Sequence, residues 1–141
     1  MPEEPDEPLA LDDRERRFLR AAMLEWGGPA KPTDALAVAL GFTKAATMSG
    51  ETWALWERIE SGEVLSSQDW RRVLAAAEAV FASDVFGSGL DWPTTSGMPD
   101  AESIAVLRGL QRKLPRCRGS TQFTVNDSGS VTLSDPERPQ P

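Results

Sequence analysis

The sequence predicts a mainly α fold, a compact bundle of four to five helices with a small C-terminal β-hairpin. Three observations predict it. Apolar residues recur at three- and four-residue intervals through most of residues 11–114, which is the spacing of one helix face. Ser, Thr or Asp precedes the main apolar runs, and Gly or Pro follows them, as at helix ends. Only beyond residue 120 does the spacing change to the alternation that is typical of a half-buried strand.

Length and composition favour a single domain with its own core. The chain has 141 residues, of which 40% are hydrophobic, and domains of this size commonly fold alone. Residues 1–8, rich in Pro and Glu, are predicted to form a disordered acidic tail, and residues 135–141, rich in Pro, a second disordered tail. The helical domain is therefore predicted to span residues 9–134, with the hairpin over residues 120–134.

The first two predicted helices have clear end signals. The first covers residues 11–26, where Asp12 suits the start of a helix and Gly27 suits its end. The second is short, covers residues 35–40 and is preceded by Thr33, a good N-cap residue.

The third predicted helix has a less certain course. Within residues 43–61, Trp53, Trp56 and neighbouring apolar residues have helical spacing. The dipeptide Ser49-Gly50 either interrupts this helix or restarts it, because Gly lowers helix propensity.

The fourth predicted helix, residues 66–81, carries the strongest local signal in the chain. Ser66 is a favourable N-cap, and Leu65 and Trp70 stand in the relation of a hydrophobic staple across it. Apolar residues at helical spacing then mark one face of the helix.

The last predicted helix covers residues 100–114 and ends before Pro115, which opposes continuation. Its predicted apolar stripe consists of Ile104, Leu107, Leu110 and Leu114. The connection over residues 83–98 contains Gly87, Gly89, Gly97 and Pro93, so a long regular element is not expected there. Connections this long are usually functional or held in place by their own side chains, and Phe86, Leu90 and Trp92 could hold this one.

The predicted hairpin follows a basic connector that contains Cys117. Residues 121–125 and 130–133 alternate between apolar and polar side chains, and Gly129 lies in the turn between them. Because an isolated hairpin is marginally stable in water, we expect this one either to pack on the helices, as in the predicted fold, or to stay loose.

The charge and the residue types exclude several classes of function. A net charge of −7 argues against wholesale binding to nucleic acid and to an anionic membrane surface, since both need a positive face. No apolar run reaches the ~18 residues of a membrane span, and the N-terminus has no signal-peptide pattern. A single cysteine, Cys117, excludes an intramolecular disulfide. We therefore expect a cytoplasmic protein.

The sequence contains few of the residue types that enzyme active sites use. The chain has no His and no Tyr, which removes Ser-His-Asp triads, Cys-His pairs and imidazole metal ligands. We predict no catalytic residue, no cofactor and no metal site. The alternative is a carboxylate-dependent hydrolase built on Glu78, Asp84 and Asp91, because paired acids beside an aromatic residue such as Trp92 suit sugar hydrolysis, and such acids also suit Mg²⁺ or Ca²⁺.

The runner-up function, ahead of the hydrolase, is DNA binding by residues 33–62. The run Leu36-Ala-Val-Ala-Leu-Gly-Phe-Thr resembles the first helix and turn of a helix-turn-helix, and Trp56-Glu-Arg-Ile-Glu-Ser-Gly resembles the end of the recognition region in phage-repressor-type regulators. The resemblance implies a DNA-binding regulator. Residues 44–52 depart from the pattern because they form a longer segment than it allows. Glu51, Glu57 and Glu60 would also repel phosphates.

The function that the sequence favours is a non-catalytic, cytoplasmic protein-interaction or regulatory module, such as an adaptor, an inhibitor or an immunity-type protein. The acidic surface predicts a protein partner with a basic surface. Aromatic residues are common at interface hot spots, and the long loop carries two of them together with two acids. The predicted partner-binding residues are Trp53, Asp84, Phe86, Asp91 and Trp92. The sequence leaves open whether the protein is a monomer or a dimer.

Overall fold

The computed structural model describes residues 7–114, 122–129 and 131–134, and this part of the chain is mainly helical, as predicted. The predicted tail residues 1–6 and 135–141, and Cys117, lie outside the described residues. In chain order the elements are α1 (Asp13–Glu25), α2 (Asp34–Ala39), α3 (Ala45–Glu60), α4 (Ser67–Ala82), the short 3₁₀ helix η1 (Gly89–Asp91), α5 (Trp92–Ser96), α6 (Asp100–Lys113), β1 (Gln122–Val125) and β2 (Val131–Ser134).

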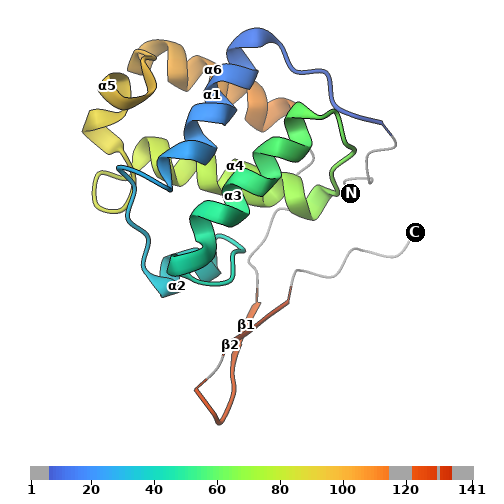
Figure 1. The fold of residues 1–141 in the computed structure, drawn as a ribbon, viewed down its shortest axis with the longest axis vertical. Helices are drawn as coiled ribbons and strands as arrows, with labels where there is room; N and C mark the ends of the chain where they lie inside the picture. The colour runs from blue at the N-terminus through green and yellow to red at the C-terminus, as the bar shows by residue number, and fades with distance from the viewer. Residues whose placement is uncertain (1–6, 115–121, 130, 135–141) are drawn as a thin grey trace.

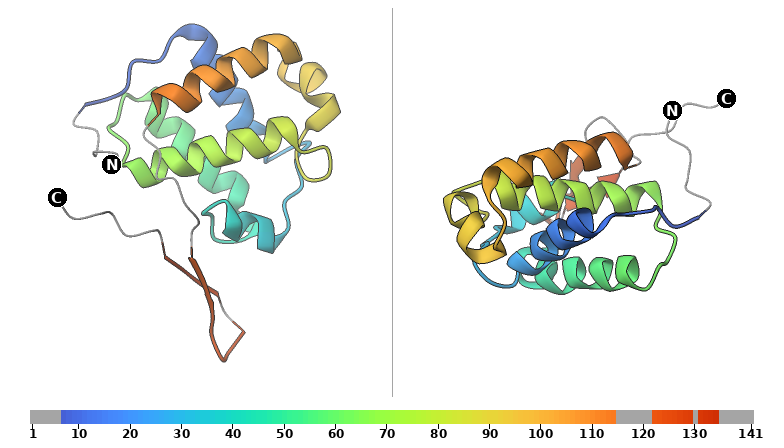
Figure 2. Two further views of the ribbon diagram at one scale, coloured as in Figure 1. Left: turned by 180° about the vertical axis from the view of Figure 1, so that it is seen from behind. Right: turned by 90° about the horizontal axis from the view of Figure 1, so that it is seen from above.

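The helices are arranged around α1, which contacts α3, α4, α5 and α6 (Figure 1). Helices α3 and α6 lie on opposite sides of the molecule, with α1 and α4 between them (Figure 2). The side chains of Phe18, Leu19, Ala22 and Met23 on α1 are fully buried, so the middle of this helix forms the centre of the core. No helix in the described part of the chain has both the length and the apolar character that a membrane span requires.

Helix starts follow the capping residues that the sequence suggested. Asp12 accepts a hydrogen bond from the Glu15 backbone N–H at 2.8 Å, and the Glu15 carboxylate accepts one from the Asp12 N–H at 2.9 Å. These two bonds form a complete capping box. At α2 and α4 the hydroxyls of Thr33 and Ser66 each accept one hydrogen bond, from the Leu36 N–H and the Asp69 N–H. Each cap satisfies a backbone donor that the helix itself leaves unpaired.

Helix α3 is continuous through Ser49-Gly50. The sequence had left undecided whether this dipeptide interrupts the helix. The helix lacks a side-chain cap of its own, but the Asp34 carboxylate accepts a hydrogen bond from the Ala45 N–H at 2.8 Å. Further along, the Thr52 hydroxyl donates to the Met23 carbonyl at 2.8 Å, which fixes α3 on α1. Tertiary contacts thus outweigh the low helix propensity of Gly50.

The segment 83–98 contains more regular structure than predicted. Helices η1 and α5 both form within it, so the described residues hold six α-helices rather than four to five. Pro93 lies at the start of α5, where its missing N–H costs no hydrogen bond. Gly97 ends the helix with φ of +76°, a conformation that favours glycine.

The two strands pair antiparallel, with Phe123 opposite Leu133 and Val125 opposite Val131. Gly129 adopts a φ of +84° in the connection between them. The packing of this hairpin on the helices stays a prediction.

Candidate functional site

Trp92, one of the predicted partner-binding residues, lies in the core instead of at the surface. Its side chain is fully buried, with ring centroids 5.3 Å from Phe18 and 5.8 Å from Phe81. The indole Nε1–H donates a hydrogen bond to the Ser103 hydroxyl at 2.8 Å. Burial of a large aromatic surface with its polar atom paired is favourable. Trp92 therefore anchors the 83–98 segment from inside, and no partner reaches its side chain in this conformation.

Glu25, which the sequence analysis did not single out, holds the same segment from the end of α1. Its side chain is only 6% exposed. Its Oε1 atom accepts hydrogen bonds from the Ser88 hydroxyl and, at 2.6 Å, from the Thr95 hydroxyl. A signal was present in the sequence, because Phe18, Ala22 and Glu25 have the i, i+4, i+7 spacing of one helix face. That spacing placed an acid on the buried face of α1.

The part of the segment before η1 is folded tightly against the end of α4. The Ser88 N–H donates to the Val80 carbonyl at 2.8 Å, and the Phe86 carbonyl accepts from the Lys31 N–H at 2.7 Å. A Cβ atom added to Gly87 would lie 2.5 Å from the Ala79 carbonyl oxygen, so only glycine fits this approach. Phe86, a predicted site residue, is half-buried here and forms part of this framework.

The same framework fixes Asp84 and Leu90 next to each other. The Asp84 carboxylate accepts a hydrogen bond from the Leu90 N–H at 2.9 Å. Gly89 lies between the two with φ of +47°, and a Cβ on it would lie 2.4 Å from the Asp84 Cα. The side chain of Leu90 is nevertheless 82% exposed. A large apolar side chain is thus held in solvent by a rigid backbone.

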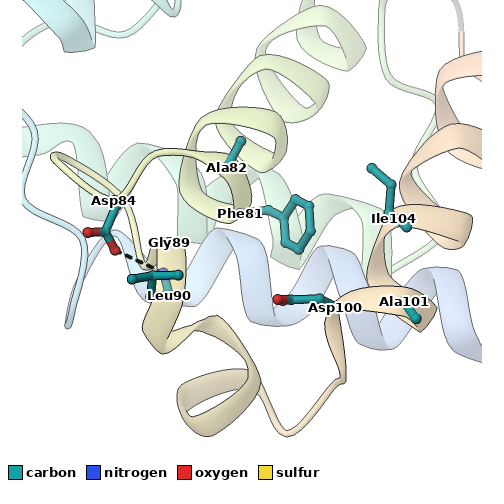
Figure 3. Close-up of a pocket in the computed structure, with 8 residues that line it drawn as sticks. All are labelled: Phe81, Ala82, Asp84, Gly89, Leu90, Asp100, Ala101 and Ile104. Carbon is teal, nitrogen blue, oxygen red and sulfur yellow. Dashed lines mark hydrogen bonds between the residues drawn. The ribbon is translucent and has the colours of Figure 1, made fainter.

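Leu90 forms one wall of an open groove of about 470 Å³. The groove lies between the end of α4, the η1 segment and the first turns of α6, and Phe81 points into it from α4 (Figure 3). Ile104, on the opposite wall, is 40% exposed, although its place in the predicted stripe implied burial. The lining residues are Phe81, Ala82, Asp84, Gly89, Leu90, Asp100, Ala101 and Ile104.

The charged groups of the groove are all acidic. Asp84 and Asp100 lie in its lining, which contains no Lys or Arg. The end of α4 adds to this potential, because its last turn carries no basic residue and the C-terminus of a helix dipole is negative. The groove therefore combines an apolar floor with a negative rim. It is suited to contact an apolar group that is accompanied by a positive charge.

The other acids of the proposed hydrolase do not join Asp84 at this groove. Glu78 accepts a hydrogen bond from the Gln111 side-chain amide at 2.6 Å, and the exposed Asp91 is not in the lining. Within residues 7–114, 122–129 and 131–134, no group of three or more His, Cys, Asp or Glu side chains could hold a metal ion. Trp53, the remaining predicted site residue, lies on α3 and is 36% exposed, also outside the groove lining.

A second hollow of about 320 Å³ lies where α2 and α3 meet α4. Two guanidinium groups, from Arg58 and Arg72, line it, but both are engaged. Arg58 binds Asp69 at 2.9 Å, and Arg72 binds Asp69 and the Gly41 carbonyl, each at 2.8 Å. Arg58 is also the only cation of the helix that would read DNA. Because Arg58 is paired with Asp69, the remaining charged side chains of α3 are all acidic. This disfavours contact with phosphates.

Comparison of the chain with protein-family models, with curated proteins and with solved structures finds no match.

Proposed function

We propose that this chain is a non-catalytic protein-interaction or regulatory module that binds its partner through the groove between α4, η1 and α6. The observation that carries the proposal is the exposure of Leu90, 82%, at the rim of an apolar hollow. A single exposed leucine needs no explanation. Here, however, it adjoins Phe81 and Ile104 around one concave surface, and contiguous apolar surface of this kind commonly marks a binding site.

The rigidity of the groove supports the same proposal. Phe81 on its floor packs edge-on against Trp92, at 5.8 Å between ring centroids, and against Phe18, at 6.4 Å. The Leu90 backbone is held by Asp84, and the segment as a whole is held by Glu25 through Ser88 and Thr95. A surface that is already ordered loses little conformational entropy when a partner binds, so more of the contact energy appears as affinity.

The proposal places the protein in a reducing, cytoplasmic compartment and assigns it no cofactor. A single cysteine in the chain favours that compartment. The roles that suit such a module are those of an adaptor, an inhibitor or an immunity-type protein, each of which acts by occupying a surface of another protein.

The proposal is tested by affinity capture of partner proteins from a cell lysate, with the parent chain and two surface variants as baits. Leu90→Ser removes the exposed wall of the groove. Val85→Ser is the control, because Val85 is 81% exposed on the same segment but is absent from the groove lining. Both variants should melt within about 2 °C of the parent chain, because exposed substitutions change stability little. We expect the Leu90 variant to lose a partner that the parent and the Val85 variant retain. Identical sets of captured proteins from all three chains would refute the proposal.

A further inference from the structure

We infer that the groove binds a peptide segment of a partner protein in which a large apolar residue is flanked by Lys or Arg. This inference rests on the proposed function and specifies the chemistry of the partner.

The apolar part of the occupant follows from the lining. Phe81, Leu90 and Ile104 contribute side chains to a hollow of about 470 Å³, and binding pockets typically measure about 300–1,000 Å³. Leu90 and Ile104 are 82% and 40% exposed, so the hollow is open. An enclosed small molecule usually has most of its surface covered, which these walls do not provide. A protein segment that inserts one side chain and covers the rim with its backbone would bury both walls.

The positive part of the occupant follows from three sources of negative potential. Asp84 lies at one wall, and the C-terminal end of α4, without a basic residue in its last turn, lies beside it. Asp100 lies across the groove, and within the described residues its carboxylate has no hydrogen bond or ion pair. The positive end of α6 partly balances Asp100, so we assign the larger share of the attraction to the Asp84 side.

An acidic partner is disfavoured by the same arrangement. Its carboxylates would approach Asp84 and Asp100 without a cation in the lining to bridge them. Like charges brought together at an interface oppose binding. The same two carboxylates would repel the phosphates of a nucleic acid.

Three fluorescein-labelled synthetic peptides provide the probe. They share a central Leu-Trp anchor and differ only in their flanking residues, which are Lys, Ser or Glu. With the full chain at low salt, fluorescence anisotropy should show the Lys peptide binding about tenfold more tightly than the Ser peptide and the Glu peptide binding more weakly still. Near 1 M salt, where the Debye length is about 3 Å, the Lys and Ser peptides should bind within about twofold of each other.

Substitutions in the groove test whether its acids cause the preference for Lys and whether its apolar wall binds the Leu-Trp anchor. Asp84→Asn combined with Asp100→Asn should reduce the preference for Lys over Ser to about twofold or less, because each exposed pair contributes modestly. Asn retains the oxygen that accepts from the Leu90 N–H, so the fold of the segment is preserved. Glu57→Gln on the exposed face of α3 is the charge control and should leave the preference unchanged. Leu90→Ser should weaken all three peptides at least about fivefold, whereas Val85→Ser should not.

The outcomes separate this inference from the proposed function. If partner capture depends on Leu90 but the Glu peptide binds as well as the Lys peptide, the inference falls and the proposed function stands. If the Lys peptide does not bind, the inference falls as well. A dimer in sedimentation that Leu90→Ser dissolves would identify a second copy of the chain as the occupant, which also overturns the inference. If Leu90→Ser changes neither capture nor peptide binding, both proposals fail.

Discussion

Replacing Trp92 by Phe should destabilise the fold without removing any surface that a partner contacts. The substitution keeps an aromatic ring between Phe18 and Phe81, whose centroids lie 5.3 Å and 5.8 Å from the indole. It removes the Nε1–H that donates to the Ser103 hydroxyl at 2.8 Å. Because Ser103 is fully buried, its hydroxyl loses this partner where water does not easily replace it.

The expected loss has two parts. The smaller ring leaves a gap of about one or two methylene equivalents, which costs about 1 kcal/mol. The hydroxyl that loses its partner costs about 1–3 kcal/mol, and the lower part of this range applies if the hydroxyl turns to a carbonyl one turn earlier in α6. The sum is about 2–4 kcal/mol, which corresponds to a melting temperature roughly 7–14 °C lower for a chain of this size. Trp92→Ala should cost about 3–5 kcal/mol.

Urea unfolding followed by far-ultraviolet circular dichroism measures this loss, and a double-mutant cycle with Ser103→Ala isolates the hydrogen bond. Ser103→Ala alone leaves the indole N–H unpaired, whereas the double variant leaves neither group unpaired. The two single losses should therefore exceed the double loss by about 1 kcal/mol. If Trp92→Phe changes the unfolding free energy by less than about 0.5 kcal/mol and yet abolishes partner capture, Trp92 acts at the surface and the argument from burial is wrong.

Three further substitutions test other parts of the structure by the same unfolding measurement. Gly87→Ala should cost more than about 2 kcal/mol, because its Cβ would lie 2.5 Å from a backbone oxygen; a neutral result would refute the tight packing of this segment. Gly50→Ala should instead stabilise the protein by about 0.5–1 kcal/mol, because it lies within α3 with no atom near the new Cβ, and a loss would mean that the helix is interrupted there. Thr95→Val removes one of the two hydroxyls that bind the buried Glu25 and should cost about 1–3 kcal/mol; Thr94→Val, at an exposed neighbour, is its control and should be close to neutral.

Local signals in the sequence were sufficient to predict where most helices begin. A cap such as Asp12 or Ser66 forms its hydrogen bond with a backbone N–H three residues later, so its effect is readable from adjacent residues. The course of α3 was not readable in this way. Its start uses the Asp34 carboxylate of α2, and its middle is held on α1 by Thr52.

The candidate site was only partly predictable for a similar reason. The length and composition of residues 83–98 indicated a segment of interest. Outside a regular helix or strand, however, no periodicity assigns residues to the inside or the outside. From the sequence, Trp92 was expected either to contact a partner or to hold the segment in place, and Leu90 to hold it in place, whereas the structure buries Trp92 and leaves Leu90 82% exposed. Ile104 shows the converse case, since its helical spacing implied burial, but near the start of α6 it lines the open groove.

The helical class, the main helix starts and the acidic balance of charge can be derived from the amino-acid order, because each depends on composition or on residues within one turn of each other. By contrast, the roles of Glu25 and Trp92 in holding the 83–98 segment, and the meeting of Asp84, Leu90 and Ile104 around one groove, became visible only in the folded chain. These residues come from separate elements, and their proximity depends on how α1, α4 and α6 pack against one another, an arrangement to which many distant side chains contribute at once.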